Sequence, residues 1–215
     1  MRILELFSGT GSIGKVFREN GHHVVSLDID NSNHSDRHIK VSILDWDYTE
    51  FAKGHFDYIH ASPPCNTFSH ARKSWINREV KAHPGIPMTM DMIIKDQLEI
   101  GLPLLNKTLE IINYFDPKYF TIENPQTGDM KKYITDIAFT DVNYCRYDLP
   151  YKKTTRIWNN FNFVGLKCNK NCKFLDGKKH ITNCDNLSLK QRYRIPKDLV
   201  ISIMDCINNQ EVVKH

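Results

Sequence analysis

The sequence has no apolar run long enough to cross a bilayer, so we expect neither a membrane-spanning segment nor a membrane partner. It has no internal repeats and no low-complexity segments. The first residues, Met1 to Leu4, are typical of a strand and lack the pattern of a signal peptide. With 40% hydrophobic and 25% charged residues, the 215-residue chain is not of the disordered class and suits one α/β domain with a small appendage.

The six cysteines occur without the context of an exported protein, so we do not expect a disulfide framework. Reduced thiols in an intracellular, reducing compartment are the expectation that follows. Some of these cysteines then have a metal-binding or catalytic use.

Basic residues exceed acidic ones by only four overall, but the excess is concentrated in one segment. Residues 1–150 contain 16 Lys/Arg and 20 Asp/Glu, whereas residues 151–200 contain 12 Lys/Arg and 3 Asp. Such a local excess is typical of a surface that binds a polyanion. A solvated face that only aids solubility is the alternative, and we favour contact with nucleic acid.

A glycine-rich turn follows the first expected strand, residues 2–7. Residues 8–14 fit the pattern G-x-G-x-x-G and lead into an expected helix, so a ligand can approach the backbone there. Asp28, near the end of a second strand over residues 23–30, is placed to bind the ribose hydroxyls of a nucleoside cofactor. Ile29 could then cover one face of an adenine. Alternatively, Asp28 only caps a loop.

Two prolines end another apolar strand, residues 56–59, and place Cys65 on a stiff loop just beyond it. A fixed position past a strand end suits a nucleophile. A buried structural thiol is the alternative reading of an isolated cysteine. A second strand, residues 118–122, ends similarly in Glu123-Asn124-Pro125.

Strands that alternate with helices predict a doubly wound, mostly parallel sheet. We expect a third strand over residues 38–44 and a helix within residues 96–115 that begins near Pro103. Residues 70–95 read as a basic, mostly irregular lid, or as a surface insertion without a function.

Several of these motifs together resemble the cytosine-5 methyltransferases, in the right order over residues 1 to about 160. Residues 6–11 resemble the first cofactor motif, residues 62–69 the catalytic Pro-Cys loop, and Glu123-Asn124-Pro125 the Glu-Asn motif. Asp28 matches the ribose-binding acid, and residues 155–158 resemble the end of the Arg-containing motif. In its short length and in the sequence of residues 123–128, the chain is most similar to compact members of the family from large DNA viruses, such as iridoviruses, or from phages.

The resemblance implies a Rossmann-like fold of the S-adenosylmethionine-dependent methyltransferases and the chemistry of that family. Cys65 would add to carbon 6 of cytosine, a protonated Glu123 would stabilise ring nitrogen 3, and Arg156 would hold the base carbonyl or a phosphate. The implied catalytic residues are Cys65, Glu123, Asn124, Arg156 and Pro64. The implied S-adenosylmethionine-binding residues are Phe7, Ser8, Gly9, Thr10, Gly11, Asp28, Ile29 and Asp45.

The expected partner is duplex DNA with a flipped cytosine. RNA, such as tRNA, is the alternative substrate, and a catalytically weak DNA-binding regulator is the alternative function. A viral protein of this kind would act in the host cytoplasm or nucleus. Whether it is a monomer or a dimer is left open by the sequence.

The chain departs from the family in three places. Ser42-Ile43 stands where an acid usually precedes the isoleucine, with Asp45 two residues later, and Thr154 replaces the first of two arginines. Residues 161–190 leave no room for a target recognition domain. We therefore predict a catalytic domain over 1–160, a small basic insertion over 161–190, and a closing helix within 191–215.

The insertion contains cysteines and a histidine at the spacing Cys-x3-Cys-x7-His-x3-Cys. Four such ligands can surround a tetrahedral zinc ion, which would order a short loop. The predicted zinc ligands are Cys168, Cys172, His180 and Cys184. Reduced surface thiols are the alternative.

Overall fold

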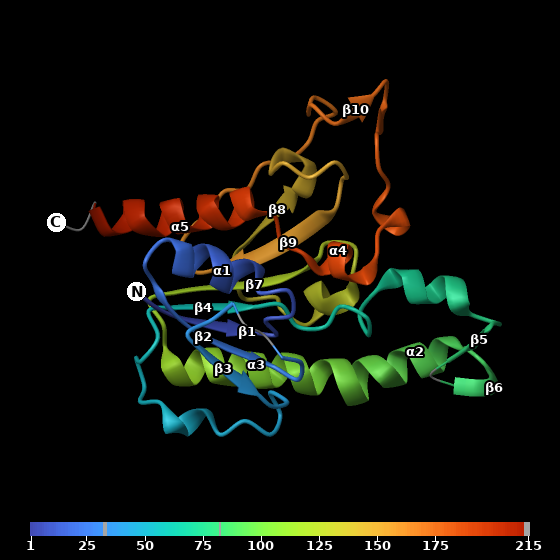
Figure 1. The fold of residues 1–215 in the computed structure, drawn as a ribbon. Coiled ribbons are helices and arrows are strands. Elements are labelled where there is room, and N and C mark those ends of the chain that lie inside the picture. Colours follow the sequence, from blue (N-terminus) through green and yellow to red (C-terminus); the bar gives the residue numbers. More distant parts are fainter. Residues whose placement is uncertain (32–33, 82, 213–215) are drawn as a thin grey trace.

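The computed structural model describes residues 1–31, 34–81 and 83–212. Its centre is a seven-stranded sheet with the order β3-β2-β1-β4-β7-β9-β8 (Figure 1). The five strands from β3 to β7 in this order run parallel, and β9 runs antiparallel to both of its neighbours. The strands are β1 (Arg2–Leu6), β2 (His23–Asp28), β3 (Arg37–Lys40), β4 (Tyr58–Ala61), β7 (Tyr119–Pro125), β8 (Phe139–Asn143) and β9 (Thr154–Asn159). The predicted doubly wound, mostly parallel sheet is confirmed.

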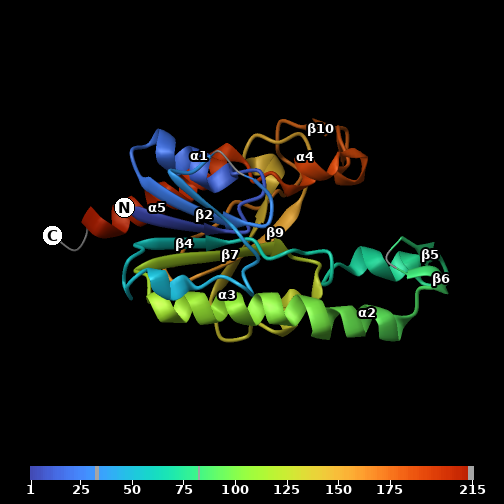
Figure 2. The ribbon, with the colours of Figure 1, turned by 60° about the horizontal axis from the view of Figure 1, so that its bottom comes forward.

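Helices cover both faces of the sheet (Figures 1 and 2). Helices α1 (Ser12–Glu19) and α5 (Lys197–Val212) pack together on one face, and α3 (Leu102–Phe115) lies on the other. Successive strand residues point to opposite faces. Ile3 of β1 therefore joins the apolar cluster of α1 and α5, whereas its neighbour Leu4 joins the cluster of α3.

The sheet order places the expected motifs at one edge. The glycine-rich turn follows β1, the Pro-Cys loop follows β4, and Glu123 lies near the end of β7. These three strands are consecutive neighbours, and the chain order reverses between β1 and β4. Open α/β sheets bind ligands at such a reversal, outside the carboxyl ends of the strands.

The stretch over residues 70–95 is more regular than we predicted. It contains a 3₁₀ helix (His70–Trp75), a hairpin of β5 (Glu79–Val80) and β6 (His83–Pro87), and helix α2 (Met90–Asp96). Helix α2 continues through a π-helical turn (Gln97–Gly101) directly into α3, so the helix begins well before Pro103. Pro103 has no backbone N–H to donate to the preceding turn, and a π turn is one way for a helix to pass such a residue.

The third strand is shorter than the predicted residues 38–44, because the chain leaves the sheet after Lys40 and turns at Ser42 to Asp45. The strands of the insertion, β10 (Leu175–Asp176) and β11 (Lys179–His180), are two residues long and lie away from the main sheet (Figure 1). Helix α4 (Leu189–Tyr193) then leads to α5, the predicted closing helix, and residues 213–215 of that segment lie outside the described residues. Further 3₁₀ turns are η1 (Tyr48–Glu50), η4 (Asp129–Lys132), η5 (Tyr144–Arg146) and η6 (Cys184–Asn186).

Among the helices that the structure describes, none combines the length and the apolar character needed to span a membrane. The predicted domain boundaries at residues 160 and 190 stay a prediction.

Candidate active site

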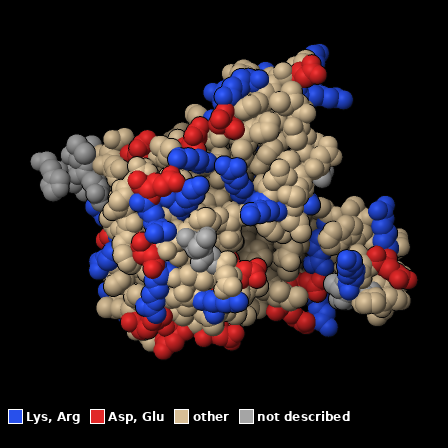
Figure 3. All heavy atoms as spheres, viewed as in Figure 1, with Lys and Arg blue, Asp and Glu red and all other residues tan. Residues whose placement is uncertain are grey.

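A cavity of about 490 Å³ opens at the carboxyl ends of β1, β2, β4 and β7. The surface is hollowed between the part that carries β10 and the part that carries β5 and β6, and Lys and Arg side chains lie on both sides (Figure 3). Most of the predicted cofactor-binding and catalytic residues line this one cavity. They are Phe7, Ser8, Gly9, Thr10, Asp28, Ile29, Pro64, Cys65, Glu123 and Asn124.

The glycine-rich turn forms one wall of the cavity. Phe7, Gly9 and Gly11 all have left-handed backbone φ angles, of 57°, 46° and 65°. Glycine adopts this region at little cost, which explains why glycine stands at two of these three positions. Gly11 caps the start of α1 rather than lining the cavity.

Asp28 is tied to this turn. Its carboxylate accepts hydrogen bonds from the Gly9 N–H at 2.8 Å and the Asp30 N–H at 3.0 Å. The next side chain, Ile29, is 67% exposed at the cavity wall. A half-exposed carboxylate beside an exposed apolar side chain suits a ribose with an attached base.

Glu5 also lines the cavity, and the sequence interpretation did not include it. It is buried in β1, and its two carboxyl oxygens accept from the Ile13 N–H at 3.2 Å and the Gly14 N–H at 3.0 Å, at the start of α1. Burial raises the pKa of Glu5 to about 8, against the opposing effect of these hydrogen bonds. An acidic residue inside an otherwise apolar strand was the available signal.

Asp45, a predicted cofactor-binding residue, does not line the cavity. Its N–H donates to the Ser42 carbonyl at 3.0 Å, and this turn carries its side chain out to solvent. Ser42 and Ile43 line the cavity instead.

The Pro-Cys loop is held by the neighbouring strand. The Asn124 side-chain amide donates to the Pro63 carbonyl at 2.8 Å, and both groups are buried. Burial raises the pKa of the half-buried Cys65 thiol, the Glu123 carboxylate raises it further, and the charges of Lys153 and Arg192 oppose the rise. Proline stiffness and the Asn124 bond together fix the position of this thiol.

Glu123 is 7% exposed and has two close neighbours. The Tyr144 hydroxyl donates to its Oε1 at 3.1 Å, and the Lys153 Nζ lies 3.7 Å from the same oxygen. Lys153 also donates to the Arg192 carbonyl at 3.0 Å and stands over the Tyr144 ring. Lys153 lines the cavity, so a fixed cation faces both Glu123 and the space beside Cys65.

The structure does not bring Arg156 to this site, in contrast to our prediction. Its guanidinium makes a two-point ion pair with Asp141, at 2.8 and 3.1 Å, and lies 3.5 Å from the centre of the Phe139 ring. Arg156 pairs with Asn124 across β7 and β9, whereas Ile157 pairs with Glu123. Because side chains alternate along a strand, Arg156 faces the opposite side of the sheet from Glu123.

Sequence reasoning therefore missed Lys153 and Tyr144. The signal for Lys153 was a basic residue directly before Thr154, which replaces the first of the two arginines in the Arg-containing motif. Tyr144 carried no signal, since nothing in the sequence relates the end of β8 to Glu123.

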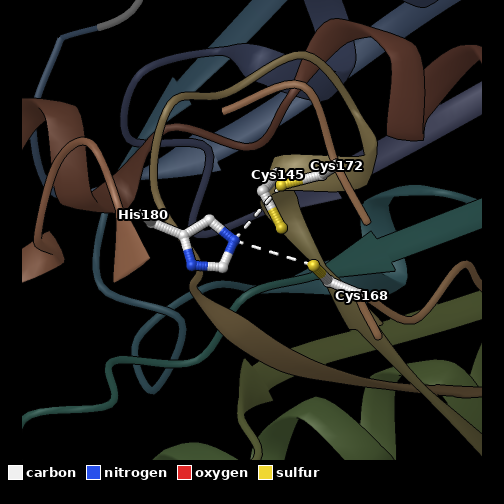
Figure 4. A group of neighbouring side chains, drawn as sticks. All are labelled: Cys145, Cys168, Cys172 and His180. Carbon is white, nitrogen blue, oxygen red and sulfur yellow. Dashed lines mark hydrogen bonds between the residues drawn. The ribbon is translucent and has the colours of Figure 1, made fainter. Parts of the chain in front are cut away.

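A separate group of thiols and an imidazole lies where the insertion meets the sheet (Figure 4). It consists of Cys145, Cys168, Cys172 and His180, whose ligand atoms all lie within 4.8 Å of one another. Three of the four predicted metal ligands are thus together, and Cys145 stands in the place we assigned to Cys184. Cys184 instead packs beside the apolar cluster of α1 and α5. Such a group can hold a metal ion.

The sequence matches the family described as C-5 cytosine-specific DNA methylase over residues 1–127. It is 36% identical over 224 residues to a Frog virus 3 protein named "Probable DNA (cytosine-5)-methyltransferase", covering 95% of this chain and 99% of that protein. Among solved structures, DNMT2 of Spodoptera frugiperda (a mutant form) is similar with a TM-score of 0.49 and 16% identity, over 79% of this chain and 55% of that chain. The methyltransferase EhMeth of Entamoeba histolytica gives a TM-score of 0.46 and 14% identity, over 75% and 54%. This chain spans about half the length of these two solved structures. On the match of more than half its length and the similarity to the viral protein, the chain belongs to the C-5 cytosine-specific DNA methylase family.

Proposed function

We propose that this protein transfers a methyl group from S-adenosylmethionine to carbon 5 of cytosine in DNA, through a covalent adduct with Cys65. The observation that carries the proposal is the shared cavity: Cys65 and Glu123 face the same space as the Asp28 carboxylate and the glycine-rich turn. A methyl donor on one wall can then reach a base on the other.

The residues of the first wall fit S-adenosylmethionine. Asp28 would accept from the ribose hydroxyls, Ile29 would pack against the adenine, and the open backbone at Gly9 would let the rest of the molecule approach closely. When bound there, this cofactor supplies an electrophilic methyl group. Phe7, Ser8, Thr10 and Ser42 complete the wall, and Asp45 has no part in it.

On the second wall, the Cys65 thiolate would add to carbon 6 of the ring and so make carbon 5 nucleophilic. The positive charge of Lys153 favours this thiolate, although burial opposes it. After methylation at carbon 5, loss of the carbon 5 proton and elimination of the thiolate restore the aromatic ring and free Cys65.

A proton held between the Glu123 carboxyl and ring nitrogen 3 would offset the negative charge that develops on this nitrogen as the thiolate adds. The hydroxyl of Tyr144 and the ammonium of Lys153 fix this carboxyl group in place. We assign to Lys153 the role that the sequence suggested for Arg156, namely a cation for the base carbonyl or a flanking phosphate. Asn124 and Pro64 position the loop of Cys65.

A duplex substrate must present the cytosine outside the stack, at a cost of a few kcal/mol. Phosphate contacts by exposed lysines and arginines beside the hollow would offset this cost (Figure 3). Exposed basic residues of the insertion and of α4 and its end are Lys167, Lys170, Lys173, Lys178, Lys179, Lys190 and Arg194.

We also propose that the group of Cys145, Cys168, Cys172 and His180, called the Cys/His group below, binds a structural zinc ion.

The test is methyl transfer from labelled S-adenosylmethionine to duplex DNA and to total tRNA in parallel, with modified cytosines mapped at base resolution. We expect label at carbon 5 of cytosine in DNA, and none with Cys65→Ser. A duplex containing 5-fluorocytosine should trap the wild-type protein covalently, because the fluorine cannot leave as the proton does. Label in tRNA alone, or normal transfer by Cys65→Ser, would contradict the proposal.

A further inference from the structure

Three thiols and one imidazole converge from separate segments at the base of the insertion (Figure 4). Nε2 of His180 lies 3.6 Å from Cys168 Sγ and 3.3 Å from Cys172 Sγ. Around a tetrahedral zinc ion with bonds of about 2.3 Å to sulfur and about 2.0 Å to nitrogen, neighbouring ligand atoms lie about 3.5–3.8 Å apart. The two distances from His180 are close to that geometry, and all four ligand atoms lie within 4.8 Å of one another.

The first residues of the insertion, Phe161 and Phe163, are buried in the core beside the sheet, but the segment after them has little apolar packing of its own. Its strands are two residues long, and Val164, Leu166 and Ile181 expose 83%, 47% and 58% of their surface. A segment that buries so little apolar surface needs a cross-link or a metal to hold one conformation. The Cys/His group is placed to supply that metal cross-link.

The fourth ligand connects this group to the catalytic carboxyl. Cys145 directly follows Tyr144, whose hydroxyl donates to Glu123 at 3.1 Å and whose backbone N–H donates to the Lys153 carbonyl at 3.1 Å. A second link runs from the Cys168 N–H to the Asn143 side chain at 2.7 Å, next to Tyr144. Anchoring Cys145 and Cys168 on one ion would therefore fix the turn that presents Tyr144.

We propose that zinc binds with Cys145, and not Cys184, as its fourth ligand, and that the bound metal holds Tyr144 and Lys153 against Glu123. The second half of this proposal rests on the proposed role of Glu123, and the first half does not. Metal loading would then set the activity of a site whose residues do not touch the metal.

The ligand set is tested by replacing zinc with cobalt(II), whose near-ultraviolet absorption grows with the number of thiolate ligands. Wild type and Cys184→Ser should bind one metal ion per chain and show equal absorption. Cys145→Ser and Cys172→Ser should each lose about a third of the absorption, because each removes one of the three thiolate ligands. Cys184→Ser is the matched control, since it removes a thiol of the same insertion. A loss in Cys184→Ser, or no metal in wild type, would overturn the proposal even if Cys145→Ser fails to fold.

The link to catalysis is tested by chelating the metal from wild type and from Tyr144→Phe. We expect an approximately tenfold loss of kcat in wild type, reversed by zinc, and a clearly smaller factor in Tyr144→Phe, because the hydrogen bond to Glu123 is already absent there. An equal factor in both proteins would show that the coupling does not run through Tyr144.

A readout without turnover separates this proposal from the proposed function. The pH midpoint of Cys65 alkylation, followed by mass spectrometry, should rise when zinc is removed, because Lys153 no longer stands near the thiol. If wild type binds zinc and shows this shift but methylates no polynucleotide, the proposed function fails and the metal link stands. An unchanged midpoint after chelation contradicts the link.

Discussion

Comparing Lys153→Gln with Arg156→Gln distinguishes the roles of the two cations near the end of the sheet. Lys153 Nζ lies 3.7 Å from the Glu123 carboxylate, and the two side chains are only 15% and 9% exposed. In the proposed reaction Lys153 would face the negative charge that develops on the base, and a cation about 4 Å from such a charge stabilises it by about 4 kcal/mol at an effective dielectric constant of 20. Allowing half of this for solvent that enters the open cavity, we expect a loss of about 2 kcal/mol, or about 30-fold in kcat/KM.

Arg156→Gln should act on stability instead. Its ion pair with Asp141 is 12% and 17% exposed and lies on the other face of the sheet. Losing one partner of this pair should lower the free energy of unfolding by about 1–3 kcal/mol, while the folded variant keeps kcat/KM within about threefold of wild type.

The assay is initial-rate methylation of a defined duplex, with urea unfolding of each variant to separate folding from catalysis. Cys65 alkylation gives a second readout, and its pH midpoint should rise in Lys153→Gln, because removing a cation disfavours the thiolate. Full activity in Lys153→Gln together with a large loss in Arg156→Gln would refute our assignment and restore the one based on sequence.

Three further changes test other parts of the site. Asn124→Ala removes the hydrogen bond to the Pro63 carbonyl, so kcat should fall at least tenfold. Urea unfolding should show a free energy of unfolding lower by about 1–3 kcal/mol, and an unchanged kcat would exclude a positioning role for Asn124. Asp28→Ala removes the acceptor for the Gly9 N–H and the proposed ribose ligand, so S-adenosylmethionine should bind about tenfold more weakly by calorimetry; equal affinity would contradict the site. Burial raises the pKa of Glu5 to about 8 in the folded protein, so the folded state retains the proton above the unfolded pKa. Between about pH 4.5 and pH 8 wild type should therefore lose stability relative to Glu5→Gln, and a difference in unfolding free energy that stays constant with pH would count against this.

Much of the fold follows from local patterns. The strands that end at Leu6, Asp28 and Ala61 are short apolar runs bounded by glycine, acid or proline, and their alternation with helices predicted the parallel sheet. The structure of residues 70–95 was harder to predict, because apolar residues recur with only weak periodicity in the hairpin of β5 and β6 and in helix α2. The early helix start depends on the Thr89 side chain, which accepts from the Met92 N–H as a cap.

The residue types and their order along the chain determined which chemistry this protein offers: a thiol after two prolines, a carboxyl before Asn-Pro, and a glycine-rich turn with an acid about twenty residues later. These motifs are local, so they can be read without knowing what lies across the sheet. The tertiary structure alone decided which cation faces Glu123, because that depends on the face of β9 to which each side chain points. It also decided that Cys145, 23 residues before Cys168, joins the Cys/His group in place of Cys184, since proximity in a fold is set by packing between distant segments and not by spacing along the chain.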